Sequence, residues 1–252
     1  MQKLSIVIIC KNNADVISNS IASFNGLTDD IVVYDNGSSD GTLKILQELN
    51  VNLVEGEWSG YGKTKNKANE FAKHDWILSL DADEGIDDEL KKILIEQDLS
   101  DPKKVYELKF KNFLGTKWLK YGEWGNDKHV RLFNKNIIWW NNATVHESLH
   151  LPAGTEIQTL KGFVIHKTAI STEAFEDKMR SYAMLNAEKY FLQGKRFSSK
   201  KKHLSAIFSF VKNYVFKLGF LDGKAGFDCA RINALYTFLK YKNLKAKTES
   251  AD

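Results

Sequence analysis

The sequence is poor in cysteine and proline, and these shortages exclude whole classes of protein. Its 252 residues include two prolines and two cysteines, Cys10 and Cys229. Two cysteines so far apart give neither a disulfide framework nor a thiolate zinc site, so we expect a reducing compartment. The N-terminal residues lead into a short apolar run without a small-residue cleavage site, so we expect no secretory signal.

Long apolar runs are also missing. The longest candidate, residues 204–221, is interrupted by Lys212, Asn213 and Lys217 and is therefore a poor membrane span. With 43% hydrophobic and 27% charged residues, the composition is typical of a soluble globular protein with one large or two small domains.

Positive and negative charges are unevenly distributed along the chain. Residues 195–252 carry 13 Lys and Arg against 4 Asp and Glu, a net charge of +9, whereas residues 1–194 carry 23 against 28, a net charge of −5. Such a basic tail indicates an anionic membrane surface or a nucleic acid as partner, unless it is only a solvated lysine-rich face. Within the tail, one helical face is predicted to carry the apolar side chains Leu204, Ile207, Phe208, Val211, Val215 and Leu218. This face predicts either peripheral membrane contact or packing against another domain or subunit.

Apolar runs and helical spacings alternate over the first 80 residues. Strands are predicted at 4–10, 31–34, 51–54 and 76–80, with helices between them at 14–24, 42–49 and 62–73. This alternation predicts an α/β fold with a doubly wound, mostly parallel sheet. Beyond it we expect a helix at 87–97, strands at 105–114 and 163–165, and helices from 172 to near 247, broken at 193–197 and 218–226.

Two carboxylates follow the fourth predicted strand. Asp81 and Asp83 are separated by one alanine at the end of a fully apolar run. Oxygen ligands at that spacing can hold a hard divalent cation, at the sheet edge where open α/β sheets bind ligands. Alternatively they cap the next helix, although Glu84, Asp87 and Asp88 could do this without them.

Asp35 ends the second predicted strand inside a turn rich in glycine and serine. A carboxylate there can accept hydrogen bonds from ribose hydroxyls or a base N–H. The alternative is a turn residue and helix cap. A G-x-G-x-x-G segment is absent, which counts against a dinucleotide fold.

Several candidates lie in or beyond the aromatic-rich residues 115–150. Glu147, beside His146, is a candidate general base, and His166 is a candidate metal ligand, although a lone histidine at a strand end is often structural. His129 and Arg131 could neutralise a diphosphate or form the polar face of an exposed strand.

Four segments, taken in order, resemble glycosyltransferase family 2. They are SIVII at 5–9, VYDNGSSDGT at 33–42, GYGKTKN at 60–66 and LSLDADE at 78–84. More loosely, residues 115–170, with RLF at 131–133 and VHE at 145–147, and the tail beyond residue 220 are similar to the branch of lipopolysaccharide-core β-glucosyltransferases.

The resemblance implies an inverting hexosyltransferase with a GT-A fold. It would move a hexose, glucose by its branch, from a UDP-sugar to a hydroxyl of a glycan or lipid-linked acceptor in lipopolysaccharide or cell-envelope polysaccharide synthesis, using Mg²⁺ or Mn²⁺. The implied domains are a catalytic domain at 1–170, with a nucleotide-sugar half at about 1–100 and an acceptor half at about 101–170, and a helical basic extension at 171–252.

The resemblance also implies roles for single residues. Asp83 and Glu147 are the catalytic pair, with Glu147 as the base, and the metal ligands are Asp83 and His166. The nucleotide-sugar contacts are Asp35, Lys63, Lys65, Asn66, Asp81, Ala82 and Arg131. Because the base motif reads His-Glu where the family has Glu-Asp, Asp127 and Glu123 stay open as alternative bases. Lys63 and Lys65 also depart from the usual small residue and arginine of the third segment.

Two other classes compete with this interpretation. A non-catalytic nucleic-acid module would use the basic aromatic tail but would leave the four front segments unexplained. A nucleotidyltransferase also needs paired carboxylates, but the glycine- and arginine-rich segment after its first strand is missing. We therefore expect no nucleic-acid partner and a cytoplasmic protein held peripherally on the cytosolic face of the inner membrane through residues 195–252. The oligomeric state is left open.

Overall fold

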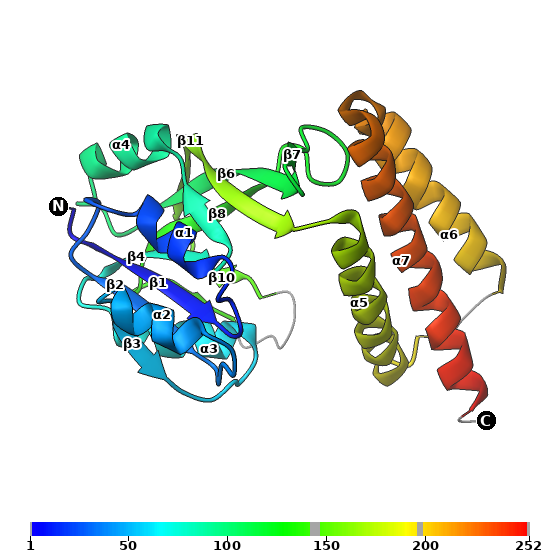
Figure 1. The fold of residues 1–252 in the computed structure, drawn as a ribbon, viewed down its shortest axis with the longest axis horizontal. Helices are drawn as coiled ribbons and strands as arrows, with labels where there is room; N and C mark the ends of the chain where they lie inside the picture. Colours follow the sequence, from blue (N-terminus) through cyan, green and yellow to red (C-terminus); the bar gives the residue numbers. More distant parts are fainter. Residues whose placement is uncertain (1, 142–146, 196–198, 251–252) are drawn as a thin grey trace. The chain divides into compact units, whose positions relative to one another are not determined.

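A computed structural model describes residues 2–141, 147–195 and 199–250 (Figure 1). The chain forms two compact units, of which the first comprises Met1–Phe110 and Lys128–His166. The second comprises Lys111–Asp127 and Lys167–Asp252. Residues 111–127, which the sequence placed in the acceptor half of the first domain, therefore lie with the C-terminal helices.

Nine strands of the described residues join one sheet, in the order β3-β2-β1-β4-β8-β6-β11-β5, with β7 paired to β6. The first four pair in parallel, and the pairs β4–β8, β8–β6, β6–β7 and β11–β5 are antiparallel. The strands are β1 (Leu4–Cys10), β2 (Ile31–Asp35), β3 (Asn52–Glu55), β4 (Trp76–Asp81), β5 (Glu84–Ile86), β6 (Lys104–Leu114), β7 (Lys117–Trp118), β8 (Lys128–Asn134) and β11 (Glu156–Ala169). A separate hairpin joins β9 (Trp139–Trp140) to β10 (Leu149–His150).

The central strand β1 is buried along its whole length because helices cover both faces of the parallel strands. Its alternate residues Leu4, Ile6 and Ile8 enter one apolar cluster, together with side chains of α1 (Ile17–Ser23), α2 (Thr42–Glu48) and α4 (Asp88–Glu96). Val7 and Ile9 enter the opposite cluster with Ala68 of α3 (Tyr61–Glu70) and Trp140 of β9. The predicted α/β fold class is thus confirmed, and its parallel strands lie within residues 1–100, the half that the sequence analysis assigned to the nucleotide sugar.

Two strands differ from the expectation. The residues directly after Asp83 form the short edge strand β5, which pairs with β11 through the register Glu84–His166, Gly85–Ile165 and Ile86–Val164. The predicted strand at 163–165 is the middle of β11, which runs over 14 residues. Both strands gain their hydrogen bonds from partners far along the chain, which a local pattern does not reveal.

The second unit is mainly helical. It contains α5 (Thr172–Leu192), α6 (Ser199–Val211), the π-helical turn η1 (Lys212–Phe216), the 3₁₀ turn η2 (Gly219–Asp222) and α7 (Gly223–Glu249). Figure 1 shows α5 and α6 lying alongside α7. No described helix is long and apolar enough to cross a membrane by itself, although Lys202–Phe216 and Gly219–Glu249, bent by 70°, pass that test of length and composition as a pair.

Gly162 of β11 allows α4 to approach the sheet, and this contact can be tested. Its φ is +78°, and a Cβ there would lie 2.3 Å from the Leu90 nitrogen, whereas Gly154, with a φ of +84°, has nothing within 4 Å. Gly154→Ala therefore measures the cost of the left-handed backbone alone, roughly 1 kcal/mol. We expect Gly162→Ala to lower the free energy of unfolding by about 1–3 kcal/mol more in urea titrations. Equal losses in the two variants would contradict close packing at Gly162.

Candidate active site

The loop after β2 is organised by Asp35. Its side chain is fully buried, and its carboxylate accepts hydrogen bonds from the amides of Gly37 and Ser38, both at 2.8 Å, and from the Ser38 hydroxyl. The Cys10 thiol at the end of β1 donates to the same carboxylate at 3.3 Å. Burial, and then the charge of Asp35, raises the pKa of Cys10 far above its usual value. Asp35, the predicted nucleotide contact, therefore also holds the loop after β2 in place through its carboxylate.

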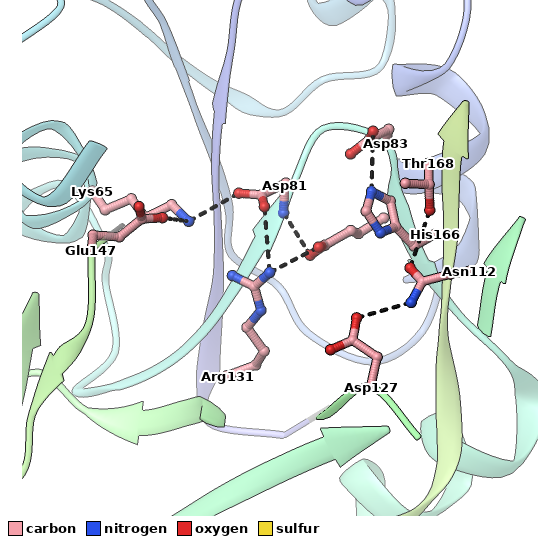
Figure 2. A network of polar contacts seen from close by, with 10 residues as sticks. Lys65, Asp81, Asp83, Asn112, Asp127, Arg131, Glu147, His166 and Thr168 are labelled. Carbon is pink, nitrogen blue, oxygen red and sulfur yellow. Dashed lines mark hydrogen bonds and ion pairs between the residues drawn. The ribbon is translucent and has the colours of Figure 1, made fainter. Parts of the chain in front are cut away.

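Asp81 stands at the centre of a charge network at the end of β4 (Figure 2). One carboxylate oxygen lies 3.0 Å from Nζ of Lys65 on α3, and the other lies 3.3 Å from the Arg131 guanidinium on β8. Burial opposes ionisation of Asp81, but these two cations hold the pKa of its carboxyl below the usual range. Asp81 is therefore an ionised anchor between two basic side chains.

Glu84 completes this network and is the residue that sequence analysis missed. Its carboxylate lies 2.8 Å from the Arg131 guanidinium and accepts the Asp81 amide at 2.9 Å. Burial raises the pKa of Glu84 even though Arg131 opposes the shift. The sequence offered Glu84 as a helix cap, but Asp87 caps α4, accepting from the Leu90 amide at 3.0 Å. The one feature of the sequence that could have indicated Glu84 is its position directly after Asp83.

Lys65 links Asp81 to Glu147. Its ammonium group lies 3.1 Å from the Glu147 carboxylate and 4.7 Å from the centre of the Trp140 ring. On the same helix, Asn66 exchanges two hydrogen bonds with the backbone of Trp140, at 2.7 and 2.9 Å. This pairing fixes β9 against α3 and uses both ends of the Asn66 amide. Lys63, one turn earlier, is exposed.

Asp83 and His166 face each other at the other side of the network (Figure 2). Their Oδ2 and Nε2 atoms are 3.4 Å apart. Burial disfavours the imidazolium, yet the bond to Asp83 raises the pKa of His166 above its usual value. Between the two carboxylates, Ala82 is buried and its carbonyl accepts the Ser20 hydroxyl at 2.8 Å.

The donor set at Asp83 and His166 fits a divalent cation only when further oxygens are supplied. Within the described ranges, no group of three or more His, Cys, Asp or Glu is arranged to hold a metal. Mg²⁺ in phosphate-transferring sites is commonly bound through one or two carboxylates, with substrate phosphates and water completing its shell. One carboxylate and one imidazole that face each other agree with that kind of site, because a diphosphate can supply the remaining oxygens.

A pocket of about 370 Å³ adjoins the network. It is lined by polar and apolar side chains, namely His129, Val130, Arg131, Trp140, Glu147, Ser148, Leu149 and Leu151. Two buried donors in these lining residues, Nε of Arg131 and Nε1 of Trp140, have no hydrogen-bond partner among the described residues. The mixed lining of charged, hydroxyl and apolar side chains suits a ligand that is rich in oxygen but also has apolar faces.

The alternative bases belong to the second unit. Asp127 accepts a hydrogen bond from Asn112 at 2.9 Å, and Asn112 in turn accepts one from Thr168 at 3.1 Å (Figure 2). Glu123 lies 3.4 Å from Nζ of Lys217. His146, the neighbour of Glu147, lies outside the described residues.

Arg131 is the cation of this network whose removal should lower the free energy of unfolding most. Arg131→Met would leave Glu84, whose side chain is 2% exposed, without its counter-charge. We expect the free energy of unfolding to fall by about 3–5 kcal/mol. Lys128→Met is the matched control on the same strand, because Lys128 is 52% exposed in its pair with Glu107 and should cost less than about 1 kcal/mol. Similar losses for both variants in urea unfolding would show that the buried network does not stabilise the fold.

The chain is similar to known glycosyltransferases over most of its length. The chain is 28% identical over 255 residues to an uncharacterised glycosyltransferase of Rickettsia typhi, an alignment that covers 97% of this chain and 87% of that protein. It is 26% identical over 247 residues to the lipopolysaccharide core biosynthesis glycosyltransferase LpsC of Rhizobium meliloti, with coverage of 94% and 89%.

A family profile and a solved structure also match this chain. The structure of S. aureus TarS in complex with UDP aligns with a TM-score of 0.47 and 16% identity, covering 100% of this chain and 92% of that one. Residues 5–108 match the profile of Glycosyl transferase family 2, a stretch that contains Asp35, Lys65, Asp81 and Asp83. Residues 5–108 thus carry the sequence pattern of glycosyl transferase family 2, and the chain is similar to glycosyltransferases over most of its length.

Proposed function

We propose that this protein is a glycosyltransferase that moves a hexose from a UDP-sugar to an acceptor hydroxyl in one inverting, metal-dependent step. The observation that carries the proposal is the line of contacts from Glu147 through Lys65 and Asp81 to Arg131, with the pair Asp83–His166 beside it (Figure 2). It supports the proposal because the residues proposed as base and as diphosphate anchor belong to one network of contacts at the carboxyl end of β4, where open α/β sheets bind ligands.

The donor would lie at the Asp83 side. Asp83 and His166 would hold Mg²⁺ or Mn²⁺, which when bound acts as a Lewis acid on the diphosphate. Lys65 and Arg131 add fixed positive charge close by, and such preorganised charge is most effective where negative charge grows on a leaving group. Asp35 and Asp81, at the ends of β2 and β4, the two strands that flank β1, would orient the nucleoside.

The acceptor would lie in the pocket beside Glu147. A hydroxyl that enters it can give its proton to the Glu147 carboxylate while its oxygen attacks the anomeric carbon. Polar side chains of the lining would hydrogen-bond further oxygens of the acceptor, and Leu149 and Leu151 would pack against its apolar faces. One displacement with a base and without a protein nucleophile inverts the anomeric centre.

The biological context follows from the relatives rather than from the site. LpsC is described by its name as an enzyme of lipopolysaccharide core synthesis. We propose the same class of product for this chain, with glucose as the first donor to test and a glycan or lipid-linked saccharide as acceptor. We also propose the division expected from the sequence, with catalysis in residues 1–170 and an accessory helical region beyond them.

Donor binding tests the proposal directly. In thermal unfolding with a panel of nucleotide sugars, we expect UDP and a UDP-hexose to stabilise the protein in the presence of Mn²⁺ or Mg²⁺. A ligand at 100 times its Kd stabilises by about 2.7 kcal/mol. Asp83→Asn should remove the metal-dependent part of this gain and abolish turnover. An unchanged melting temperature with every nucleotide sugar and both metals would contradict the proposal.

The base assignment needs a separate variant. We expect Glu147→Gln to lower turnover by about 10²–10⁴-fold, because general base catalysis supplies that range. The variant should still be stabilised by UDP and metal, since Gln keeps the shape of the side chain. Asp127→Asn and Glu123→Gln are the matched controls and should retain most activity. If either control loses more turnover than Glu147→Gln, that residue is the base.

A further inference from the structure

The predicted apolar face of the tail is present and exposed in the structure. On α6, Leu204, Ile207 and Phe208 are 62–65% exposed. The helix contacts α7 through other side chains, with His203 against Phe238 and Phe210 against Phe227. Packing of α6 on α7 therefore leaves this stripe uncovered.

The stripe continues into the turn between α6 and α7. Five of the seven residues from Val215 to Leu221 are exposed large hydrophobics, which are Val215, Phe216, Leu218, Phe220 and Leu221. Phe216 is 72% exposed. We call the exposed apolar residues of 204–221 the apolar ridge. A contiguous patch of this kind marks an interaction surface.

The turn holds these side chains outward by backbone contacts beneath them. A Cβ on Gly226 of α7 would lie 1.9 Å from the Gly219 carbonyl oxygen, so α7 and η2 approach as closely as backbones allow. The Asp222 carboxylate accepts the Tyr121 amide at 2.9 Å, and the Lys217 carbonyl accepts the Gly122 amide at 2.9 Å. Leu218 adopts a left-handed φ of 58°. The apolar turn is thus a fixed feature of the second unit.

Within the ridge segment itself the charged residues have one sign. Residues 199–221 contain five lysines and no Asp or Glu. Lys212 and Lys217 flank the most exposed part, and Lys217 is paired with Glu123 at 3.4 Å. Lys224, just beyond the turn, is 85% exposed. Aromatic and aliphatic side chains rimmed by lysine are the composition of segments that lie in the headgroup region of anionic bilayers.

We propose that the apolar ridge docks the protein on an anionic lipid bilayer. Phe216, Leu218, Phe220 and Leu221 enter the acyl boundary, and Lys212 and Lys217 contact the headgroups. A second copy of this chain would place five lysines against five lysines, which charge repulsion disfavours. The proposal does not depend on the proposed reaction. It identifies the surface through which the predicted peripheral membrane binding would take place.

Vesicle flotation tests the surface. We expect binding to phosphatidylcholine vesicles with about 30% phosphatidylglycerol and about tenfold weaker binding without the anionic lipid. Phe216→Ser combined with Leu221→Ser should lose most of this binding. The control, Leu185→Ser with Leu192→Ser, removes equally exposed apolar side chains of α5 and should bind like the parent protein. Circular dichroism melting shows whether each variant is folded.

A fluorescent label locates the contact even where the double variant unfolds. Burial raises the pKa of both native thiols, of Cys229 to about 12, so a cysteine added at the surface is labelled selectively. We expect a dye on Phe216→Cys to shift to the blue with anionic vesicles and a dye on Leu185→Cys to stay unchanged. No binding by the parent protein, equal shifts at both positions, or a dimer in light scattering that Phe216→Ser disrupts would overturn the proposal.

Discussion

The ion pairs that Arg131 makes with Glu84 and Asp81 are the interaction on which the rest of the site depends. Removing a guanidinium and two carboxylates from water is costly unless each charge is compensated. Here each charge has a partner of opposite sign. Arg131 pairs with Glu84, and Asp81 pairs with both Lys65 and Arg131. Each member comes from a different part of the fold, so the network is complete only when β4, β5, β8 and α3 are all in place.

This constraint explains why the acidic motif has its particular form. Asp81 and Glu84 face inward to the cations and support the loop, and the Glu84 carboxylate accepts the Asp81 amide. Asp83, between them in sequence, instead meets His166 across the antiparallel pair β5–β11. One short acidic segment thereby supplies carboxylates to two kinds of partner, the cations Arg131 and Lys65 on one side and the imidazole of His166 on the other. The turn at Ala82 and Asp83 is the physical cause, because alternation along one continuous strand would put Asp81 and Asp83 on the same face and Glu84 on the other.

Much of the first unit followed from local pattern. The fully apolar β1 and the helices after β1, β2 and β3 were predicted because a buried parallel sheet needs apolar strands with amphipathic helices on both faces. The order of the antiparallel strands was not, since the patterns at 105–114 and 163–165 predicted strands without identifying the strands they pair with. Their partners lie far away in sequence, as in β11, which is paired with β5 some 80 residues earlier. The second unit likewise takes in residues 111–127, which no local signal separated from the first.

The sequence by itself determined the α/β fold class, the family motifs, and the identity of Asp35, Asp81, Asp83 and Glu147 as candidate site residues. It could do so because strand ends and turn chemistry are local properties of the chain. Only the tertiary structure decided which charges meet: that Lys65 joins Asp81 to Glu147, that Glu84 is buried against Arg131, and that Asn66 holds Trp140. Ion pairs between distant residues depend on strand order and register, and these arise from the packing of the whole sheet.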